Sequence, residues 1–122
     1  MLKTALIGCG AIARGHMGYL ERSTVTKVVA VCDASAAAGR YFRERFGIPA
    51  SFTDAAEMLG TVKPDVVHVL TPPRTHASLV ATALQAGAHV FCEKPIALTL
   101  GEHDRIKELA RSTGRRYMES HN

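Results

Sequence analysis

The 122-residue sequence has no tryptophan, few cysteines and no long apolar run. Its three cysteines, Cys9, Cys32 and Cys92, are odd in number and lack the C-x-x-C spacing, which argues against a disulfide framework or a zinc site and suits a reducing compartment. No apolar stretch approaches the roughly 20 residues needed to cross a bilayer, and the first residues lack the basic start of a signal peptide. We therefore expect a cytoplasmic protein with no membrane partner.

Charge is also limited. Charged residues make up 21% of the chain, the formal net charge is +4, and the basic residues are scattered. This balance mildly favours anionic ligands but is too weak to predict a nucleic-acid partner. An apolar content of 47% is typical of globular proteins, and the length is typical of one domain. We expect a single compact domain over residues 1–122.

Short apolar runs alternate with stretches of helical periodicity along the whole chain, without internal repeats. The apolar runs predict strands at 2–7, 25–32, 51–52, 65–70 and 88–92, with an edge strand at 116–120. The periodic stretches predict helices at 11–21, 35–46, 54–59, 75–86 and 99–114. Such alternation specifies an α/β fold, a three-layer doubly wound parallel sheet with helices on both faces. In these sheets ligands bind at the carboxyl ends of the strands.

Two helices carry more detailed signals. Thr99 and Glu102 have the spacing of a capping box, in which each side chain accepts a hydrogen bond from the other residue's backbone amide. The periodicity of the first helix predicts an inner face formed by Ile12, His16, Tyr19 and Leu20.

The turn after the first strand has the pattern G-x-G-x-x-A, formed by Gly8, Gly10 and Ala13. The first glycine permits a tight turn, the second lets a diphosphate approach the backbone, and the small third residue lets the helix pack closely on the strand. The helix N-terminus then presents free amides and the positive end of its dipole to the phosphates. Taken alone, this short motif is weak. Its position between a strand and a helix favours a dinucleotide-binding Rossmann domain.

Asp33 strengthens this interpretation, because it lies 20 residues after Ala13 at the end of the second strand. A carboxylate there meets the adenosine ribose hydroxyls and repels the 2′-phosphate of NADP, so NAD is favoured. Arg40 is within reach of a 2′-phosphate, which leaves NADP open. The alternative is that Asp33 only caps the following helix and that the glycines form a plain tight turn.

Two further motifs follow the fourth and fifth strands. Thr71-Pro72-Pro73-Arg74-Thr75-His76 comes after one, and Glu93-Lys94-Pro95 comes after the other. By themselves they are a strand terminator and a solvated charge pair. At carboxyl ends of strands, however, they lie where the nicotinamide half of a dinucleotide would extend. A lysine there can hydrogen-bond a substrate hydroxyl and, if its pKa is lowered by its surroundings, exchange a proton.

The combination of G-x-G-x-x-A, Asp33, T-P-x-x-x-H and E-K-P resembles the glucose–fructose oxidoreductase, inositol dehydrogenase and rhizopine-catabolism (Gfo/Idh/MocA) family. The resemblance covers the whole chain but only the N-terminal cofactor domain of that family. It implies a dehydrogenase or reductase of sugars, inositols or related polyols that uses NAD or NADP. Hydride would pass between the alcohol carbon and the nicotinamide, with the cofactor supplying the chemistry and the protein the positioning.

The resemblance also implies roles for individual residues. The backbone of Gly10, Ala11 and Ile12 would hold the pyrophosphate next to Gly8, and Asp33 would hold the adenosine ribose. The cofactor's path would be lined by Thr71, Pro72 and His76, with Glu93 at the nicotinamide ribose, Lys94 as the catalytic residue and Asn122 beside the nicotinamide. The Lys94-Pro95 bond is a candidate cis peptide, because X-Pro bonds cost little in that form.

The family's substrate domain, with its catalytic Asp/His pair, has no counterpart in this sequence. The chain is either a piece of a longer enzyme, inactive alone, or a free-standing domain. A non-catalytic NAD-binding or redox-sensing module therefore stays an alternative, and a coenzyme A or mononucleotide domain is a third. Substrate identity is open, and so is a homo-oligomeric state.

The remaining histidines and cysteines have plainer interpretations. His68 and His89 are expected to be satisfied core or sheet-edge residues, because no second ligand is spaced for a metal. His16 either packs or approaches a cofactor phosphate, and His103 packs or is exposed. Cys9 and Cys32 end adjacent strands, where small apolar filling is favoured over a redox pair.

Overall fold

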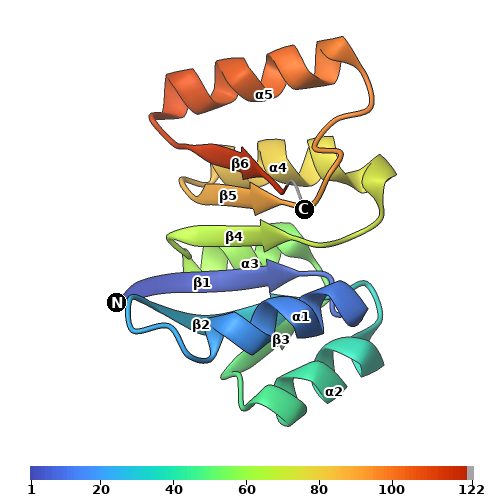
Figure 1. The fold of residues 1–122 in the computed structure, drawn as a ribbon, viewed down its shortest axis with the longest axis vertical. Coiled ribbons are helices and arrows are strands. Elements are labelled where there is room, and N and C mark those ends of the chain that lie inside the picture. Colours follow the sequence, from blue (N-terminus) through green and yellow to red (C-terminus); the bar gives the residue numbers. More distant parts are fainter. Residues whose placement is uncertain (121–122) are drawn as a thin grey trace.

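Six parallel strands form one central sheet in the computed structural model, which describes residues 1–120 (Figure 1). Their order across the sheet is β3-β2-β1-β4-β5-β6. Every pairing between neighbouring strands is parallel. The predicted doubly wound parallel sheet is confirmed. The strands are β1 (Leu2–Ile7), β2 (Thr26–Cys32), β3 (Ala50–Phe52), β4 (Val66–Val69), β5 (His89–Cys92) and β6 (Tyr117–Glu119).

In the described part of the chain, residues 1–120, five α-helices cover the two faces of this sheet, and a single 3₁₀ turn, η1 (Pro73–Thr75), precedes one of them. Figure 1 shows α1 and α2 in front of the sheet and α3 and α4 behind it. Within residues 1–120, none of these helices has the length and apolarity that crossing a membrane requires. The helices are α1 (Ala11–Leu20), α2 (Ala36–Phe46), α3 (Ala55–Val62), α4 (His76–Gln85) and α5 (Leu100–Thr113).

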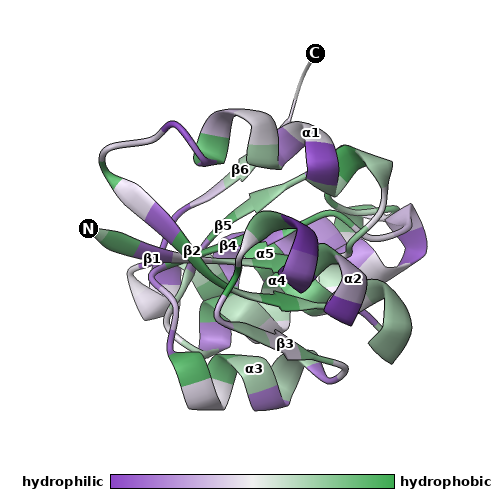
Figure 2. Cartoon of the chain, turned by 90° about the horizontal axis from the view of Figure 1, so that it is seen from below, coloured by the Kyte–Doolittle hydropathy of each residue, from purple (hydrophilic) through white to green (hydrophobic). Residues whose placement is uncertain are grey.

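The core divides into two clusters because successive strand residues point to opposite faces. Ala5 and Ile7 of β1 pack in the cluster that contains residues of α3, α4 and α5. Leu6, between them, packs with Met17 of α1 and Phe42 of α2 in the other cluster. Figure 2 shows the central strands as mostly apolar ribbons between helices of mixed hydropathy. Both faces of the sheet are therefore buried, as its apolar strands predict.

Short polar residues and glycines set the helix ends. The Ser35 hydroxyl accepts a hydrogen bond from the Ala38 amide at the start of α2, and the Asp54 carboxylate accepts one from the Ala56 amide at the start of α3. Gly47 and Gly114 end α2 and α5 in the left-handed conformation, with φ of 65° and 69°. These signals explain why the predicted boundaries of most elements lie close to the observed ones.

The predicted inner face of α1 is partly wrong. His16 and Leu20 are buried as expected, but Ile12 and Tyr19 are 53% and 48% exposed. Ala13 and Met17 are buried in their place. The buried set follows the helical spacing i, i+3, i+4, i+7 from Ala13, whereas the predicted set follows i, i+4, i+7, i+8 from Ile12, so the two stripes differ by a rotation about the helix axis.

The capping box of α5 is also only half formed. The Thr99 hydroxyl accepts from the Glu102 amide at 3.1 Å, as predicted. The Glu102 carboxylate, however, accepts from the amide of Leu98 at 2.9 Å, one residue before the cap. The glutamate thus still accepts from a free amide just before the helix, but this is the amide of Leu98 and not that of Thr99, which a full capping box requires.

Candidate functional site

A cleft of about 630 Å³ opens at the carboxyl edge of β1, β2 and β4. It collects residues from three of the sequence motifs, namely the glycine turn, Asp33 and the Thr71-Pro72 turn. The lining residues are Ile7, Gly8, Cys9, Gly10, Cys32, Asp33, Ala34, Thr53, Asp54, Ala55, Leu70, Thr71, Pro72, Arg74, Thr75 and Leu79.

Gly8 makes the tight turn that brings the chain from β1 to α1. Its φ is +103°, and a Cβ built there would lie 2.8 Å from the carbonyl oxygen of Leu70. Its amide donates to the carbonyl of Cys32 at 2.7 Å. A side chain at this position would therefore be strained and would collide with the end of β4.

Gly10 has the opposite environment, because a Cβ built there meets nothing within 4 Å. It is the N-cap of α1, and no side chain among residues 1–120 caps that helix or places an acid in its first turn. Its first-turn amides therefore have no side-chain cap among these residues, and of the three predicted residues Gly10 lines the cleft whereas Ala11 and Ile12 do not. The arrangement of Gly10, Ala11 and Ile12 fits a diphosphate, for which a Cβ at Gly10 would be an obstacle.

Asp33 is half-buried and both of its carboxylate oxygens accept backbone hydrogen bonds. Oδ2 accepts from the Cys9 amide at 3.0 Å, and Oδ1 accepts from the Ser35 amide at 2.9 Å. The cap of α2 is Ser35, so the alternative in which Asp33 only caps that helix is wrong. The second lone pair of each oxygen stays available to hydroxyl donors, and the carboxylate is fixed beside the glycine turn.

The three residues expected on the cofactor's path divide between two places. Thr71 and Pro72 line the cleft. His76 is 1% exposed and lies below the loops, with Nε2 2.6 Å from the carbonyl oxygen of Thr71 and Nδ1 2.7 Å from that of Pro95. Its ring therefore holds two loops together rather than lining the cleft.

Glu93 and Lys94 follow β5, on the far side of β4 from the glycine turn. The Glu93 carboxylate is 15% exposed and its Oε1 lies 2.9 Å from Nε2 of His16. Lys94 is exposed, and the Lys94-Pro95 bond is cis, as expected from the sequence. Neither residue lines the cleft described above. Asn122, the remaining predicted site residue, lies outside the described residues.

A cluster of ring side chains joins α1, β4 and β5, and sequence reasoning did not find it. Nδ1 of His16 lies 2.9 Å from Nδ1 of His68 and 3.0 Å from the Tyr19 hydroxyl. Burial, followed by the charge of His16, lowers the pKa of His68 from 6.5 to about 4. Burial, followed by the charge of Glu93, raises the pKa of Tyr19. The inward position of His16 was visible in the sequence, but its partners depend on the strand order.

The three cysteines are unpaired. Burial raises the pKa of Cys9 to about 12, that of Cys32 to about 11 and that of Cys92 to about 12, with nearby carboxylates adding to the effect. Thiols that stay protonated are poor nucleophiles. Small apolar filling is therefore the better description of Cys9 and Cys32, even though Sγ of Cys9 lies 3.8 Å from the Cys32 carbonyl oxygen.

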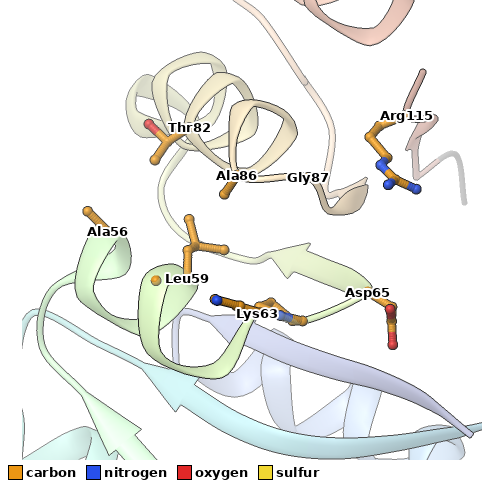
Figure 3. Close-up of a pocket in the computed structure, with 10 residues that line it drawn as sticks. Ala56, Leu59, Lys63, Asp65, Thr82, Ala86, Gly87 and Arg115 are labelled. Carbon is orange, nitrogen blue, oxygen red and sulfur yellow. The ribbon is translucent and has the colours of Figure 1, made fainter. Parts of the chain in front are cut away.

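A second depression, of about 510 Å³, lies at the opposite edge of the sheet (Figure 3). It lies beside Lys63 and Gly87, which follow the C-terminal ends of α3 and α4, and Arg115. Helix C-termini carry the negative ends of helix dipoles, which is the wrong sign for phosphate. None of the sequence motifs contributes to it, so the carboxyl-edge cleft is the better candidate for the dinucleotide.

Comparison with known proteins agrees with this geometry. Residues 2–121 match the Gfo/Idh/MocA family model, described as an oxidoreductase family with an NAD-binding Rossmann fold. D-glucoside 3-dehydrogenase of Escherichia coli is 37% identical over 115 residues, which are 93% of this chain and 33% of the relative. D-apiose dehydrogenase of Paraburkholderia graminis is 41% identical over 100 residues, which are 82% of this chain and 27% of the relative.

Solved structures show the same relationship. The WlbA dehydrogenase of Chromobacterium violaceum, solved in complex with NADH and UDP-GlcNAcA, aligns with a TM-score of 0.92 at 29% identity over 98% of this chain and 34% of its own. The chain thus spans about a third of the length of the relatives it matches. With the glycine turn, Asp33 and the strand order in place, the chain belongs to the Gfo/Idh/MocA oxidoreductase family and forms its NAD-binding Rossmann domain.

Proposed function

We propose that this chain binds NAD in an extended form along the carboxyl edge of the sheet and serves an oxidoreductase that acts on a hydroxyl group of a sugar, inositol or related polyol. One observation carries the proposal, which is the order of the motif residues along that edge. Asp33 follows β2, the glycine turn follows β1, Thr71 follows β4 and Glu93 follows β5. The order of acceptor, free amides and acceptor matches ribose, diphosphate and ribose.

The described residues fit such a ligand. The open space at Gly10 leaves room for a diphosphate at the uncapped start of α1. Asp33 is held by two backbone amides in a position to accept from ribose hydroxyls. Its charge disfavours an additional phosphate, which supports NAD over NADP. Arg40, the residue for which the sequence leaves NADP possible, does not line the cleft itself but lines an adjoining depression that shares Thr53 with it.

Lys94 is our candidate for the catalytic residue. Bound nicotinamide supplies the hydride acceptor, and this chain supplies a group that meets the substrate hydroxyl. Lys94 is exposed at the carboxyl edge, next to a glutamate that is fixed by His16. Its ammonium group can donate a hydrogen bond to the substrate oxygen, and its neutral amine can accept the hydroxyl proton as hydride leaves the carbon. The substrate class rests on the relatives, which are dehydrogenases of glucosides, apiose and inositol.

A cytoplasmic location is part of the proposal. It is supported by three thiols that are unpaired. Free thiols persist in reducing compartments and are converted to disulfides in oxidising ones when geometry allows.

Calorimetry with NADH, NADPH and coenzyme A tests the binding step. We expect NADH to bind with micromolar or weaker affinity, NADPH more weakly, and coenzyme A not at all. Coenzyme A binding in preference to NADH would overturn the proposal. Gly10→Val serves as the matched variant, since its side chain would fill the open space at the turn, and it should abolish NADH binding without unfolding the protein.

The catalytic step requires a separate experiment. The coding sequence beyond Asn122 should continue for roughly two hundred residues if a substrate domain follows. In that longer protein, Lys94→Ala should abolish polyol-dependent reduction of NAD while leaving NADH affinity close to the wild-type value. A stop codon after Asn122, or a fully active Lys94→Ala variant, would contradict the catalytic assignment.

A further inference from the structure

His16 connects the phosphate-binding helix to the loop that carries Lys94. It is 6% exposed on α1, and its two ring nitrogens point in different directions. Nε2 lies 2.9 Å from Oε1 of Glu93, the residue directly after β5. Nδ1 lies 2.9 Å from Nδ1 of His68 on β4 and 3.0 Å from the hydroxyl of Tyr19. A single side chain thus bridges three elements of the fold.

The chemistry of these partners fixes the direction of the central hydrogen bond. An ionised carboxylate only accepts, so Nε2 of His16 carries a hydrogen and donates it to Glu93. In the neutral ring Nδ1 is then an acceptor with a single lone pair, which receives from either the Nδ1–H of His68 or the hydroxyl of Tyr19. In the charged ring Nδ1 donates instead, with His68 as a neutral acceptor. Nε2 donates to Glu93 in both cases.

Aromatic packing holds the two imidazoles in this arrangement. The Phe91 ring stacks on His68 with centroids 5.1 Å apart and an interplanar angle of 29°. The same ring meets His16 edge-on, with centroids 5.5 Å apart and an angle of 70°. Burial keeps His68 neutral at physiological pH, since its pKa is lowered to about 4. The charge that faces His16 is therefore the Glu93 carboxylate.

This arrangement occupies one carboxylate oxygen of Glu93 and leaves the other open. Among residues 1–120 the hydrogen bonds of this carboxylate involve Oε1 only. The Glu93 side chain is 15% exposed, so the carboxylate is only partly buried. Glu93 also lies two strands from the glycine turn along the carboxyl edge, on the side opposite to Asp33. It is thus a fixed acceptor where the second ribose of an extended dinucleotide would arrive.

We propose that His16 is a positioning residue that holds Glu93 so that Oε2 accepts a hydroxyl of the nicotinamide ribose. Its position also couples α1 to the loop that presents Lys94. The inference rests on the proposed NAD binding, and it concerns only the nicotinamide half of the ligand. His68 and Tyr19 act on Glu93 through His16, by fixing the orientation of the imidazole ring.

A purely structural role makes a different prediction. If the network only satisfies polar groups in the core, its disruption lowers stability and weakens all ligands alike. If His16 positions Glu93, its disruption weakens ligands that contain the nicotinamide ribose and spares ligands that lack it. The truncated probe must therefore lack the nicotinamide ribose. ADP-ribose still contains that second ribose, whereas ADP keeps only the adenosine and the diphosphate of NADH, so ADP is the better probe.

The test is calorimetric titration of wild type, His16→Asn and His16→Gln with NADH and with ADP. The asparagine side chain is too short to place a donor at Nε2, whereas the glutamine amide can reach that place. We expect His16→Asn to weaken NADH binding by about tenfold, the usual effect of losing a hydrogen bond to a charged group. ADP affinity should change by less than about twofold, and His16→Gln should recover most of the NADH affinity. His103→Asn, the same substitution on α5, is the control.

The outcomes separate this inference from the proposed function. Wild-type protein that binds neither NADH nor ADP would overturn the proposed function. Wild-type protein that binds both equally tightly, or a His16→Asn variant that loses both affinities in parallel, would overturn the role of His16 alone.

Nuclear magnetic resonance of the ring nitrogens gives a readout that needs no ligand. Long-range ¹H–¹⁵N spectra should show His16 protonated at Nε2 in the wild-type protein. Glu93→Gln should shift the His16 nitrogen signals, and Lys94→Gln should not. A His16 ring with an unprotonated Nε2, or one that does not respond to Glu93→Gln, would contradict the arrangement.

Discussion

Nδ1 of His76 lies 2.7 Å from the carbonyl oxygen of Pro95, so the first residue of α4 is tied to the loop that follows β5. The other ring nitrogen, Nε2, lies 2.6 Å from the carbonyl oxygen of Thr71. The ring is 1% exposed. Because the Thr71 turn lines the cleft and the Pro95 loop carries Lys94, this histidine fixes the spacing between two parts of the candidate site.

Replacing His76 by phenylalanine tests that bridge. The new ring fills a similar volume but has no N–H, so the part-buried carbonyl oxygen to which the imidazole donates, that of Thr71 or that of Pro95, loses its donor. We expect the free energy of unfolding to fall by about 1–3 kcal/mol, the usual cost of an unsatisfied buried polar group. Urea unfolding measures it. His103→Phe, on the half-buried side of α5, is the control, and equal effects of the two variants would contradict a bridging role.

The two glycines of the turn should respond differently to alanine. Gly8→Ala introduces a Cβ 2.8 Å from the Leu70 carbonyl oxygen at a φ of +103°. We expect it to lower the free energy of unfolding by about 1–3 kcal/mol, typical of backbone strain. Gly10→Ala meets nothing within 4 Å and should cost only about 0.5 kcal/mol or less. Urea unfolding of both variants measures the two losses, and equal losses would contradict the prediction.

Gly10→Ala should have a large effect on NADH affinity, in contrast to its small effect on the free energy of unfolding. Its added methyl group projects into the space that we assign to the diphosphate, so NADH affinity should fall although the fold is intact. Calorimetry on the folded Gly10→Ala variant measures this loss. Unchanged NADH affinity would place the diphosphate elsewhere.

Asp33 should control the choice between NADH and NADPH. Asp33→Asn removes the negative charge while keeping the size of the side chain and one acceptor oxygen. Because the charge no longer opposes a 2′-phosphate, the ratio of NADH to NADPH affinity should fall by about tenfold, equivalent to the roughly 1.4 kcal/mol of a modest charge interaction. Calorimetry with both cofactors measures the ratio. Asp104→Asn on exposed α5 should leave it unchanged, and an unchanged ratio in Asp33→Asn would contradict the assignment.

The fold was predictable because its signals are local. Strand and helix periods alternate, and residues such as Ser35, Asp54 and Gly47 mark helix ends within one or two positions. The glycine turn and Asp33 could equally be found from the sequence, since they belong to one strand–helix–strand unit and are separated by the number of residues that such a unit requires. The Lys94-Pro95 cis bond was also anticipated.

Contacts that depend on strand order were not predictable. His16 and His68 are 52 residues apart and meet because β4 lies next to β1. No local sequence pattern predicts the contact between these two histidines. The same limit applies to His76, whose sequence motif suggested the cofactor's path, whereas its ring lies beneath the loops. Exposure of Ile12 and Tyr19 was missed because their stripe and the buried stripe that begins at Ala13 both have helical spacing, so periodicity alone does not choose between them.

His68 should make stability depend on pH. Its native pKa is lowered from 6.5 to about 4, chiefly by burial and then by the charge of His16. Above pH 6.5 the ring is neutral in both the native and the unfolded chain, so protonation of His68 does not lower the free energy of unfolding there. Between pH 6.5 and 4 the unfolded chain takes up a proton that the native protein does not. The free energy of unfolding therefore falls as the pH is lowered, by an amount on the order of 3 kcal/mol at pH 4.

Urea unfolding between pH 7 and pH 4 isolates this contribution when wild type is compared with His68→Gln, which cannot titrate. Carboxylates contribute equally to both proteins, so the wild type should lose more stability across this window than the variant. His103→Gln should behave like the wild type. A direct measurement follows the His68 ring signals of the native protein by nuclear magnetic resonance, where they should remain those of a neutral imidazole at pH 5. A midpoint near 6.5 would show that the ring is hydrated, and the burial argument for the His16–His68 contact would fail with it.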